Sequence, residues 1–453
     1  MRVVIFLLAG LMLQPPVFSA NPPPSPTAAI LLIAGDLHSA YERTAHFVAR
    51  VDRVIAENPG VPLAVLINGD ALEYGNAVAR RSEGAVDFAM FRALVARAPT
   101  VVNLGNHEAD FHAMPDAVAQ LRATGVTVIS ANARNRSTGE PFAPAFTRLT
   151  LGAHEAVIVG LMTDRLNTFR AAVRPTLDLR EPGAWAEQHL EALFGGAMLP
   201  VILSHSGVRA DRRVLPLAPD GTLFAGAHDH LRFVHREGRT VYFHSGSWLD
   251  FVSLARLRRV DGAWHWQVEQ VRIEENDPRD PALASLIRET YARHLTADES
   301  QIVGRTPHAL APSEAARFAV EAARAATGAD VALVGGTTFG AGLPAGDVTR
   351  FAFDACVRFD GTLWHAQVEG AQLQRILARA NQGVDTPFAA RSGENLVAVG
   401  SREIVAGKTY RFVTTDWIAK NPRDYLGDDP PSLTELPAVK LKAAVMAALN
   451  SAP

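Results

Sequence analysis

Short apolar runs alternate with stretches of helical spacing in the N-terminal part of the chain. The apolar runs lie at 29–34, 63–67, 101–104 and 126–129. The stretches with helical spacing lie at 41–57, 86–96 and 115–124. Apolar residues three and four positions apart predict one buried face of a helix, and the short runs predict strands. Strands that alternate with helices are typical of an α/β sheet that is covered by helices.

The pattern becomes richer in strands after residue 145. Between 145 and 273 short apolar runs follow one another, among them 201–203 and 222–224. Residues 234–243, with Glu237 and Gly238 in their middle, predict a β-hairpin. Together with the preceding runs they predict further strands in this part of the chain.

A second unit follows residue 275. Residues 276–310 carry Pro278 and Pro281 and then one helical stretch, and we interpret them as a connector. Beyond it, an amphipathic helix at 313–327 precedes two apolar runs that flank a helix near 370–381. A chain of 453 residues is too long for one ordinary core. The sequence therefore predicts an α/β protein with a larger domain at 21–275, a connector at 276–310, and a smaller α/β domain at 311–453.

The first twenty residues have the features of a signal peptide. Arg2 precedes an apolar stretch at 3–13, and small residues allow cleavage after Ser19 or Ala20. The apolar stretch is too short to span a bilayer comfortably, so an uncleaved anchor is the weaker alternative. With 1–20 removed, the protein is predicted to be periplasmic or secreted, without a membrane span.

Composition narrows the function. The formal net charge of -3 indicates no general attraction to a nucleic acid polymer or to an anionic membrane. Cys356 is the single cysteine, so neither an intrachain disulfide nor a cysteine-based zinc site is possible. Neither feature points to a particular oligomeric state.

Five of the apolar runs are followed by Asp, Asn or His. These residues are Asp36 and His38, Asp70, Asn106 and His107, His205, and His228 and His230. In open α/β sheets the carboxyl ends of the strands form the ligand-binding crevice. The polar residues are therefore predicted to be neighbours in space although they are scattered along the chain.

Imidazole, carboxylate and amide groups are ligands for zinc, manganese or iron. Two such ions can hold a hydroxide and clamp a phosphoryl group during in-line displacement. A glycine before several of these residues lets the backbone turn tightly at the strand end. Taken singly, Asp36 could be a helix cap and Asp70 an ordinary turn residue. The whole set in this order favours a centre with two divalent metal ions.

The set Asp-x-His, Gly-Asp, Gly-Asn-His-Glu, His and Gly-x-His-x-His resembles the calcineurin-like metallophosphoesterase superfamily. For the larger domain this resemblance implies a β-sandwich flanked by helices. The resemblance implies one metal held by Asp36, His38 and His230, a second held by Asn106, His205 and His228, and Asp70 as the bridge. It also implies that His107 and Asp110 form a catalytic dyad, in which the carboxylate orients the imidazole at the phosphoryl group. Glu108 is expected to be a structural residue beside the site. Ala227 departs from the pattern, because the family often has glycine before the first His of its last motif.

The later part of the chain resembles the C-terminal domain of 5'-nucleotidases, in the segments 329–336, 345–348, 368–373 and 410–425. In that family this domain recognises the nucleoside and closes over the metal site. Three departures concern the substrate. The segment 335–339 lacks the family's arginine, 358–361 replaces Pro-Phe-Gly-Asn, and 421–425 replaces Gly-Gly-Asp-Gly-Tyr.

Related nucleotidases hold the base between two aromatic rings. The resemblance places Phe388 and Trp417 near those positions, and Arg391 is the candidate to replace the missing arginine. The alternative is that both rings pack in the core of the second domain.

The predicted function is hydrolysis of a small-molecule phosphate ester, most simply a nucleotide, by an exported enzyme with two metal ions. A cyclic-nucleotide phosphodiesterase, a nucleotide-sugar hydrolase and a thiosulfohydrolase-like enzyme are enzymatic alternatives. A ligand-binding protein with a vestigial site is the alternative from another class, but loss of function would be expected to remove at least one ligand.

Overall fold

The apolar run at 29–34 is part of strand β1, Thr27–Ala34, in the computed structural model, which describes residues 26–196, 199–401 and 403–451. Side chains of β1 alternate between two cores. Leu31 and Ile33 face the interior between two sheets, whereas Ile30 and Leu32 face the helices. From residue 29 to residue 34 the strand is entirely apolar, and both of its faces are buried there. The predicted signal peptide at 1–20 lies outside the described residues.

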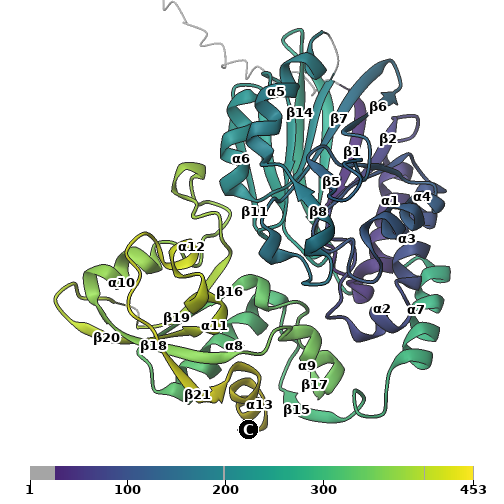
Figure 1. Cartoon of the computed structure of the whole chain (residues 1–453). Coiled ribbons are helices and arrows are strands. Elements are labelled where there is room, and N and C mark those ends of the chain that lie inside the picture. The colour runs from purple at the N-terminus through teal and green to yellow at the C-terminus, as the bar shows by residue number, and fades with distance from the viewer. Residues whose placement is uncertain (1–25, 197–198, 402, 452–453) are drawn as a thin grey trace, which may run out of the picture.

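Two six-stranded sheets form the sandwich of the larger unit (Figure 1). The first sheet consists, in spatial order, of β14 (Ala263–Arg272), β13 (Phe251–Val260), β1, β2 (Leu63–Asn68), β3 (Thr100–Asn103) and β4 (Thr127–Ile129). The second consists of β11 (Arg232–Glu237), β12 (Thr240–Ser245), β10 (Leu223–Gly226), β9 (Leu199–His205), β7 (His154–Met162) and β6 (Phe146–Leu151). A small additional sheet pairs β5 (Ala133–Asn135) with β8 (Leu177–Leu179).

Helices cover the outer face of each sheet. On the first sheet lie α1 (Tyr41–Glu57), α3 (Ala85–Val95), α4 (Met114–Ala123) and, at the edge, α2 (Ala77–Arg81). On the second lie α5 (Pro182–Phe194) and α6 (Val208–Val214). Short 3-10 turns occur at η1 (Leu166–Thr168), η2 (Arg174–Thr176) and η3 (Leu215–Leu217), and in the smaller unit at η4 (Gly336–Thr338) and η5 (Phe388–Ala390).

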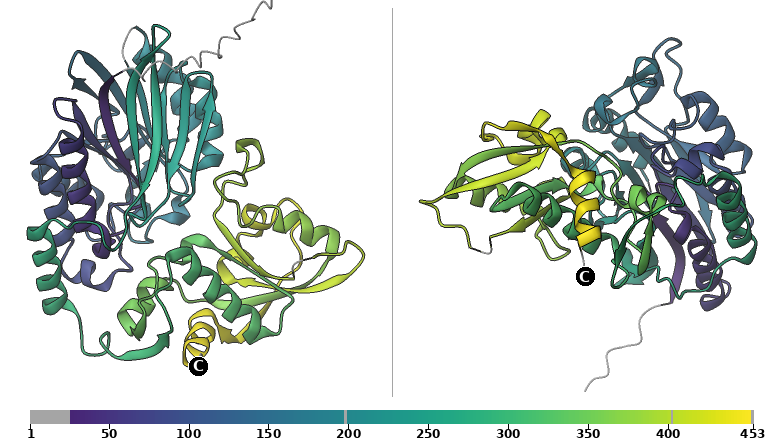
Figure 2. Two further views of the ribbon diagram at one scale, coloured as in Figure 1. Left: turned by 180° about the vertical axis from the view of Figure 1, so that it is seen from behind. Right: turned by 90° about the horizontal axis from the view of Figure 1, so that it is seen from below.

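Strand direction brings the predicted site residues to one end of the sandwich. Strands β1, β2 and β3 pair in parallel in the first sheet, and β9 and β10 pair in parallel in the second. The residues that follow these strands therefore leave the sheets at their carboxyl ends. Figure 2 shows the smaller unit beside this end of the sandwich.

The predicted connector divides between the two units. Helix α7 (Pro281–His294) packs on α1 and α3 of the larger unit. Strand β15 (Ile302–Thr306) pairs with β17 (Gly346–Thr349) of the smaller unit. The stretch between α7 and β15 joins them.

The smaller unit is built on a five-stranded sheet. Its spatial order is β19 (Leu396–Gly400), β16 (Val331–Gly335), β20 (Thr409–Thr415), β18 (Thr362–Glu369) and β21 (Thr434–Lys440). One core includes α8 (Pro312–Thr327), α9 (Arg350–Cys356) and α13 (Leu441–Ser451). The core on the other face includes α10 (Gly370–Leu377), α11 (Asp416–Lys420) and α12 (Pro422–Leu426). The prediction of two α/β units, a helix-flanked sandwich and a smaller domain, is confirmed.

The helix predicted near 370–381 ends earlier, at Leu377. Asn381 has a left-handed backbone, with φ of 53°, and its side-chain amide donates to the carbonyl of Ala398 on β19. The amide oxygen of Asn381 accepts from the backbone N–H of the same residue, Ala398. This pair of bonds to a strand replaces the next helical turn.

None of the helices in the described part of the chain has both the length and the apolar composition needed to cross a bilayer.

Candidate metal centre

Five of the predicted metal ligands have a left-handed backbone. The φ angles are 51° at Asp36, 51° at His38, 52° at Asp70, 82° at His228 and 56° at His230. Positive φ is uncommon for residues other than glycine and costs about 1–3 kcal/mol at each position. Such conformations cluster at functional sites, where the surrounding structure holds them in place. The strained backbone of the loops at the strand ends therefore indicates a functional role for the side chains that these loops hold in place.

Hydrogen bonds tie these loops together. The backbone N–H of Asp36 donates to the carbonyl of Gly69, at 3.1 Å, and that of His38 donates to the carbonyl of Asp70, at 2.9 Å. Glu108 is fully buried, and its carboxylate accepts from the N–H groups of Gly105, Asp70 and Ala71. Glu108 therefore fixes the loops after β2 and β3, which agrees with its expected structural role.

The glycines beside the ligands serve close approach more than turning. Of Gly35, Gly69 and Gly105, only Gly69 has a positive φ, of 75°. A Cβ at Gly69 would collide with the ring of His205, and a Cβ at Gly105 would collide with the carboxylate of Asp70. The prediction that these glycines allow tight turns therefore holds only for Gly69. At all three positions the absence of a Cβ mainly lets two strand ends approach each other.

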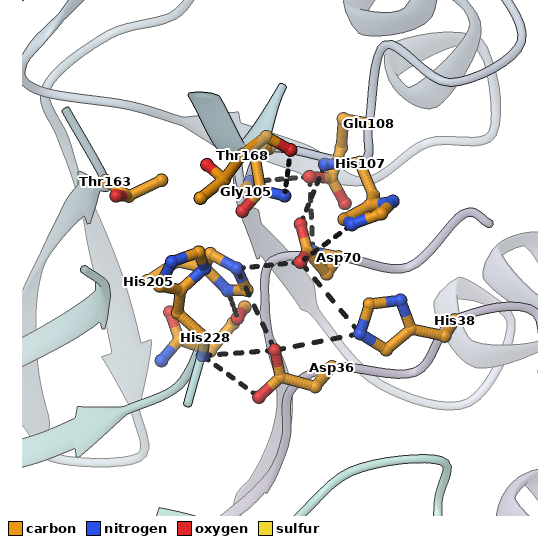
Figure 3. Close-up of polar contacts among 12 residues, drawn as sticks. Asp36, His38, Asp70, Gly105, His107, Glu108, Thr163, Thr168, His205 and His228 are labelled. Atoms are coloured by element: carbon orange, nitrogen blue, oxygen red, sulfur yellow. Dashed lines mark hydrogen bonds and ion pairs between the residues drawn. The ribbon is translucent and has the colours of Figure 1, made fainter. Parts of the chain in front are cut away.

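The side chains converge as Figure 3 shows. Asp36, His38 and His230 offer ligand atoms within 4.8 Å of one another, as do Asp70, His205 and His228. Oδ2 of Asp70 lies 3.0 Å from Nε2 of His205 and 4.0 Å from Nε2 of His38. The carboxylate of Asp70 thus lies between the two groups, in the position that a bridging ligand requires.

The remaining atoms of these ligands fit metal binding. Nδ1 of His205 lies 2.8 Å from the carbonyl oxygen of Asn68, so Nδ1 donates to that oxygen and Nε2 is the ring nitrogen that faces Asp70. Nδ1 of His38 lies 3.1 Å from a carboxylate oxygen of Glu73, which likewise leaves Nε2 on the side of Asp70. The amide nitrogen of Asn106 donates to the carbonyl of Thr168, while its buried oxygen has no hydrogen-bond partner in the described part of the chain. Ligating histidines in proteins are usually oriented in this way.

Electrostatics point in the same direction. Burial raises the pKa of Asp36 to about 7. Burial would also raise the pKa of Asp70, but the charges of His205, His107 and His38 outweigh it and keep this pKa well below its usual value. Burial holds the pKa of His228 and of His230 well below the usual value, so both rings are neutral. At His205 burial lowers the pKa, but the charge of Asp70 and the bond to it outweigh burial and raise this pKa to about 10. Buried carboxylates that attract positive charge in this way form a suitable environment for divalent cations.

His107 and Asp110 stand beside this group as a pair. Nδ1 of His107 lies 2.8 Å from Oδ2 of Asp110, which also accepts from the backbone N–H of Tyr74 at 2.6 Å. Burial lowers the pKa of His107, but the charges of Asp110, Asp70 and Glu73 raise it by more. The pKa of His107 therefore lies well above its usual value. The imidazole therefore favours the protonated form.

Phe388 and Arg391 lie at the contact between the two units. The ring of Phe388 is half-buried and lies 4.6 Å from the ring of His235 and 5.2 Å from that of Tyr242, both on the second sheet. The guanidinium of Arg391 donates to the carbonyls of Gly383 and Val384. None of these described contacts is with a residue of the metal cluster.

Trp417 has a different environment. Its indole N–H donates to the hydroxyl of Tyr425 at 2.7 Å, and its side chain is 42% exposed. No described contact joins it to Phe388. In the part of the chain that the structure describes, the two predicted rings therefore do not contact each other directly.

Three residues that lie at or beside the site were not predicted from the sequence. Glu73 lies beside His38, Trp248 stacks on His38, and Arg358 of the smaller unit pairs with Glu73. Glu73 follows Asp70 by three positions, which is a usable signal for a carboxylate near the centre. Trp248 and Arg358 have no such signal, because their positions depend on how distant segments pack.

Comparisons with known proteins agree with this geometry. Residues 30–232 match the family model for calcineurin-like phosphoesterases, and residues 294–425 match the model for the 5'-nucleotidase C-terminal domain. No curated protein sequence matches the chain.

Three solved structures share the fold over nearly the whole chain. The 5'-nucleotidase precursor from Thermus thermophilus is 19% identical, with a TM-score of 0.60, over 93% of this chain and 96% of that one. The sulfate thiohydrolase SoxB from the same organism is 16% identical, with a TM-score of 0.62, over 95% of each chain. The 5'-nucleotidase from Candida albicans is 11% identical, with a TM-score of 0.60, over 95% of this chain and 99% of that one.

Proposed function

Because the chain belongs to the calcineurin-like phosphoesterases with a 5'-nucleotidase C-terminal domain, which are metal-dependent hydrolases, we propose that it is an exported enzyme that hydrolyses nucleotide phosphate esters. The observation that carries this proposal is the convergence of the ligand atoms around Asp70, with the dyad of His107 and Asp110 beside them. A structural cluster would not need so many strained residues at one place.

Each ligand has its proposed place. Asp36, His38 and His230 would hold one divalent ion, Asn106, His205 and His228 would hold the other, and Asp70 would bridge them. When bound, the two ions would supply a nucleophile from water at neutral pH and the positive charge that stabilises an in-line displacement. The negative charge of Asp70 reduces the repulsion between the two cations.

His107 acts on the phosphoryl group and not on the metals. Its side chain is 21% exposed, whereas that of Asp110 is 1% exposed. The bond from Nδ1 to Asp110 leaves Nε2 directed away from the carboxylate. A proton held at Nε2 stabilises charge on a phosphoryl oxygen or on the leaving oxygen as it develops.

Exposed aromatic rings support a flat ligand such as a nucleobase. In the described part of the chain, the large aromatic side chains that are more than a third exposed are Tyr74, Phe359 and Trp417. The N–H of Tyr74 bonds to Asp110, and Phe359 directly follows Arg358, which pairs with Glu73 at 3.0 Å. Stacking on such a ring stabilises a bound base by about 1–3 kcal/mol.

The geometry favours Phe359 over Phe388 as the ring that accompanies Trp417. A Cβ at Gly361 would collide with the carboxylate of Asp416, so the loop of Phe359 touches the residue before Trp417. Phe388 instead packs against the second sheet of the larger unit. We therefore propose Trp417 and Phe359 as the base-stacking rings.

The experiment is a substrate panel with added manganese. It includes nucleotides, cyclic nucleotides, nucleotide sugars, sulfur esters and p-nitrophenyl phosphate. We expect two ions per chain and the highest kcat/KM for a nucleotide. Asp70→Asn, the matched control, is expected to lose both ions and turnover. If the wild-type protein binds two ions but prefers a sulfur ester, the proposed substrate class is wrong. If it binds no ions or shows no turnover, the proposal that it is a metal-dependent enzyme is wrong.

Export is tested separately. N-terminal sequencing of the protein recovered from the periplasm or the medium is expected to start at Ala20 or Asn21. A full-length protein retained in the cytoplasm would contradict export.

A further inference from the structure

Arg358 of the smaller unit is buried against the larger one. It follows α9, and its side chain is 3% exposed. Nη2 of Arg358 lies 3.0 Å from Oε1 of Glu73, on the loop after β2. Its Cζ lies 4.4 Å from the ring centroid of Trp248, on the loop before β13. A cation of one unit is thus enclosed by residues of the other.

Both residues that enclose Arg358 also contact the metal ligand His38. The second carboxylate oxygen of Glu73 lies 3.1 Å from Nδ1 of His38. The ring of Trp248 stacks on that of His38, with centroids 4.6 Å apart and planes 26° apart. Arg358 is therefore linked to His38 along two routes, each of which passes through a single side chain.

The space for Arg358 is shaped by a glycine in each unit. A Cβ at Gly75, in the larger unit, would lie 2.6 Å from Nη2 of Arg358. A Cβ at Gly340, in the smaller unit, would lie 2.9 Å from Cδ of Arg358. Both distances are too short for a real Cβ contact. A larger residue at Gly75 would therefore meet the guanidinium first, whereas one at Gly340 would meet the carbonyl oxygen of Ala355, at 2.5 Å, as well as the side chain of Arg358.

The backbone of Trp248 is held in place as well. Its φ of 58° is left-handed, and its N–H donates to the carbonyl of Asp36 at 2.8 Å. The same segment therefore contacts one metal ligand through its backbone and another through its ring. A strained bulky residue persists only where the surroundings fix it.

The two carboxylate oxygens of Glu73 have different partners. Oε1 lies 3.0 Å from Nη2 of Arg358 and accepts from the backbone N–H of Gly75, whereas Oε2 lies 3.1 Å from Nδ1 of His38. Glu73 is buried, and a buried carboxylate is stabilised by a paired cation. Without Arg358 this carboxylate would lose its ionic partner and would hold its orientation toward Nδ1 of His38 less firmly.

We propose that Arg358 is a positioning residue for the metal centre, which couples docking of the C-terminal domain to the orientation of His38. Docking brings Arg358 to Glu73 and Trp248, and these two side chains hold His38 with Nε2 toward the proposed ion. Because such coupling is reciprocal, an ion bound at His38 strengthens the contact between the two domains. This inference rests on the proposed metal centre.

The test measures manganese affinity by competition with a chelator, in the absence of substrate. Removing a residue that orients a metal ligand typically weakens metal binding about 10- to 100-fold. We expect Glu73→Gln to fall in that range at one of the two ions. Arg358→Gln should weaken the same ion by roughly tenfold, again in the range for an orienting residue. Arg358→Lys should recover part of the loss, since it keeps the charge but not the planar fork.

A double variant tests whether Arg358 acts on His38 through Glu73 or whether the two residues affect metal binding independently. If Arg358 acts through Glu73, the variant with both Glu73→Gln and Arg358→Gln binds manganese about as weakly as Glu73→Gln alone. Arg212→Gln is the matched control, because Arg212 also crosses the domain contact but donates to the carbonyls of Phe388 and Arg391. It should bind manganese like the wild type.

The outcomes are distinct. Wild-type affinity in a folded Arg358→Gln protein, fully additive losses in the double variant, or an equal loss in Arg212→Gln would each overturn the coupling. Circular dichroism of the metal-free proteins shows whether each variant is folded. If the wild type itself takes up no manganese, the proposed metal centre fails instead, and the two failures are distinguishable.

Discussion

Asp110 accepts a hydrogen bond from Nδ1 of His107, with 2.8 Å between the two atoms. The carboxylate is buried and also accepts from the backbone N–H of Tyr74. The backbone N–H of Asp110 donates to the carbonyl of His107, which closes a turn around the pair. The imidazole therefore has one orientation, set by a residue three positions away.

We predict that His107→Ala removes most of the turnover and leaves the metal content unchanged. A group that transfers a proton or stabilises charge in this way contributes about 10²- to 10⁴-fold to the rate. Asp110→Asn should lose less, because the amide oxygen still accepts from Nδ1 and only the charge is lost. Measurements of kcat with p-nitrophenyl phosphate and of bound metal check both variants. An empty metal site in His107→Ala would show that the histidine is a ligand.

The strand ends could be predicted because their signal is local. Each apolar run is buried on both faces, so its end is visible in the sequence, and Asp36 and Asp70 follow their runs within two or three positions. The parallel direction of these strands then places the polar residues at one edge. Hydrophobic pattern and residue type were sufficient for this part.

The contacts between the domains could not be predicted in the same way. Arg358 and Phe388 both meet the larger domain, and nothing in their neighbouring residues indicates which surface they contact. An arginine in a loop is usually a solvated residue. The burial of Arg358 beside Glu73 depends on how the two units dock, and the hydrophobic pattern along the sequence does not indicate this.

Asp87 provides a prediction about pH and stability. It lies on α3, is buried, and accepts from the hydroxyl of Tyr41 at 2.7 Å. Burial raises its pKa from 3.8 to about 7. The folded protein therefore binds this proton more tightly than the unfolded chain does. The contribution of Asp87 to the free energy of unfolding consequently falls as the pH rises from 3.8 to about 7.

Asp87→Asn removes the ionisation and keeps an acceptor for Tyr41. The melting temperature of the variant, relative to that of the wild type, should therefore increase between about pH 4 and pH 7. Thermal unfolding at several pH values, with the same metal content throughout, checks this. Asp220→Asn is the control: Asp220 bonds to Arg239 and its pKa is lowered, so its contribution to stability is lost only below about pH 4. The difference in melting temperature between this variant and the wild type should therefore be nearly constant from about pH 4 to pH 7. A difference in melting temperature that does not vary with pH would show that Asp87 is not perturbed.

The last prediction concerns the base-stacking rings. Trp417→Ala should raise the KM for a nucleotide and leave kinetics with p-nitrophenyl phosphate nearly unchanged, since the small ester has no base to stack. A loss of about 1–3 kcal/mol corresponds to a roughly 5- to 150-fold increase in KM, provided that KM follows binding. Phe359→Ala should behave in the same way, because its ring is also exposed and its loop touches Asp416.

Two further variants distinguish stacking from packing. Trp417→Phe keeps a ring but loses the bond to the hydroxyl of Tyr425, so the nucleotide KM should stay close to that of the wild type if stacking is what matters. Phe388→Ala removes a ring that packs between the domains and should affect both substrates alike. Equal losses on both substrates in Trp417→Ala, or earlier thermal unfolding without a change in KM, would show that Trp417 is a packing residue. A selective loss in Phe388→Ala alone would return the stacking role to that ring.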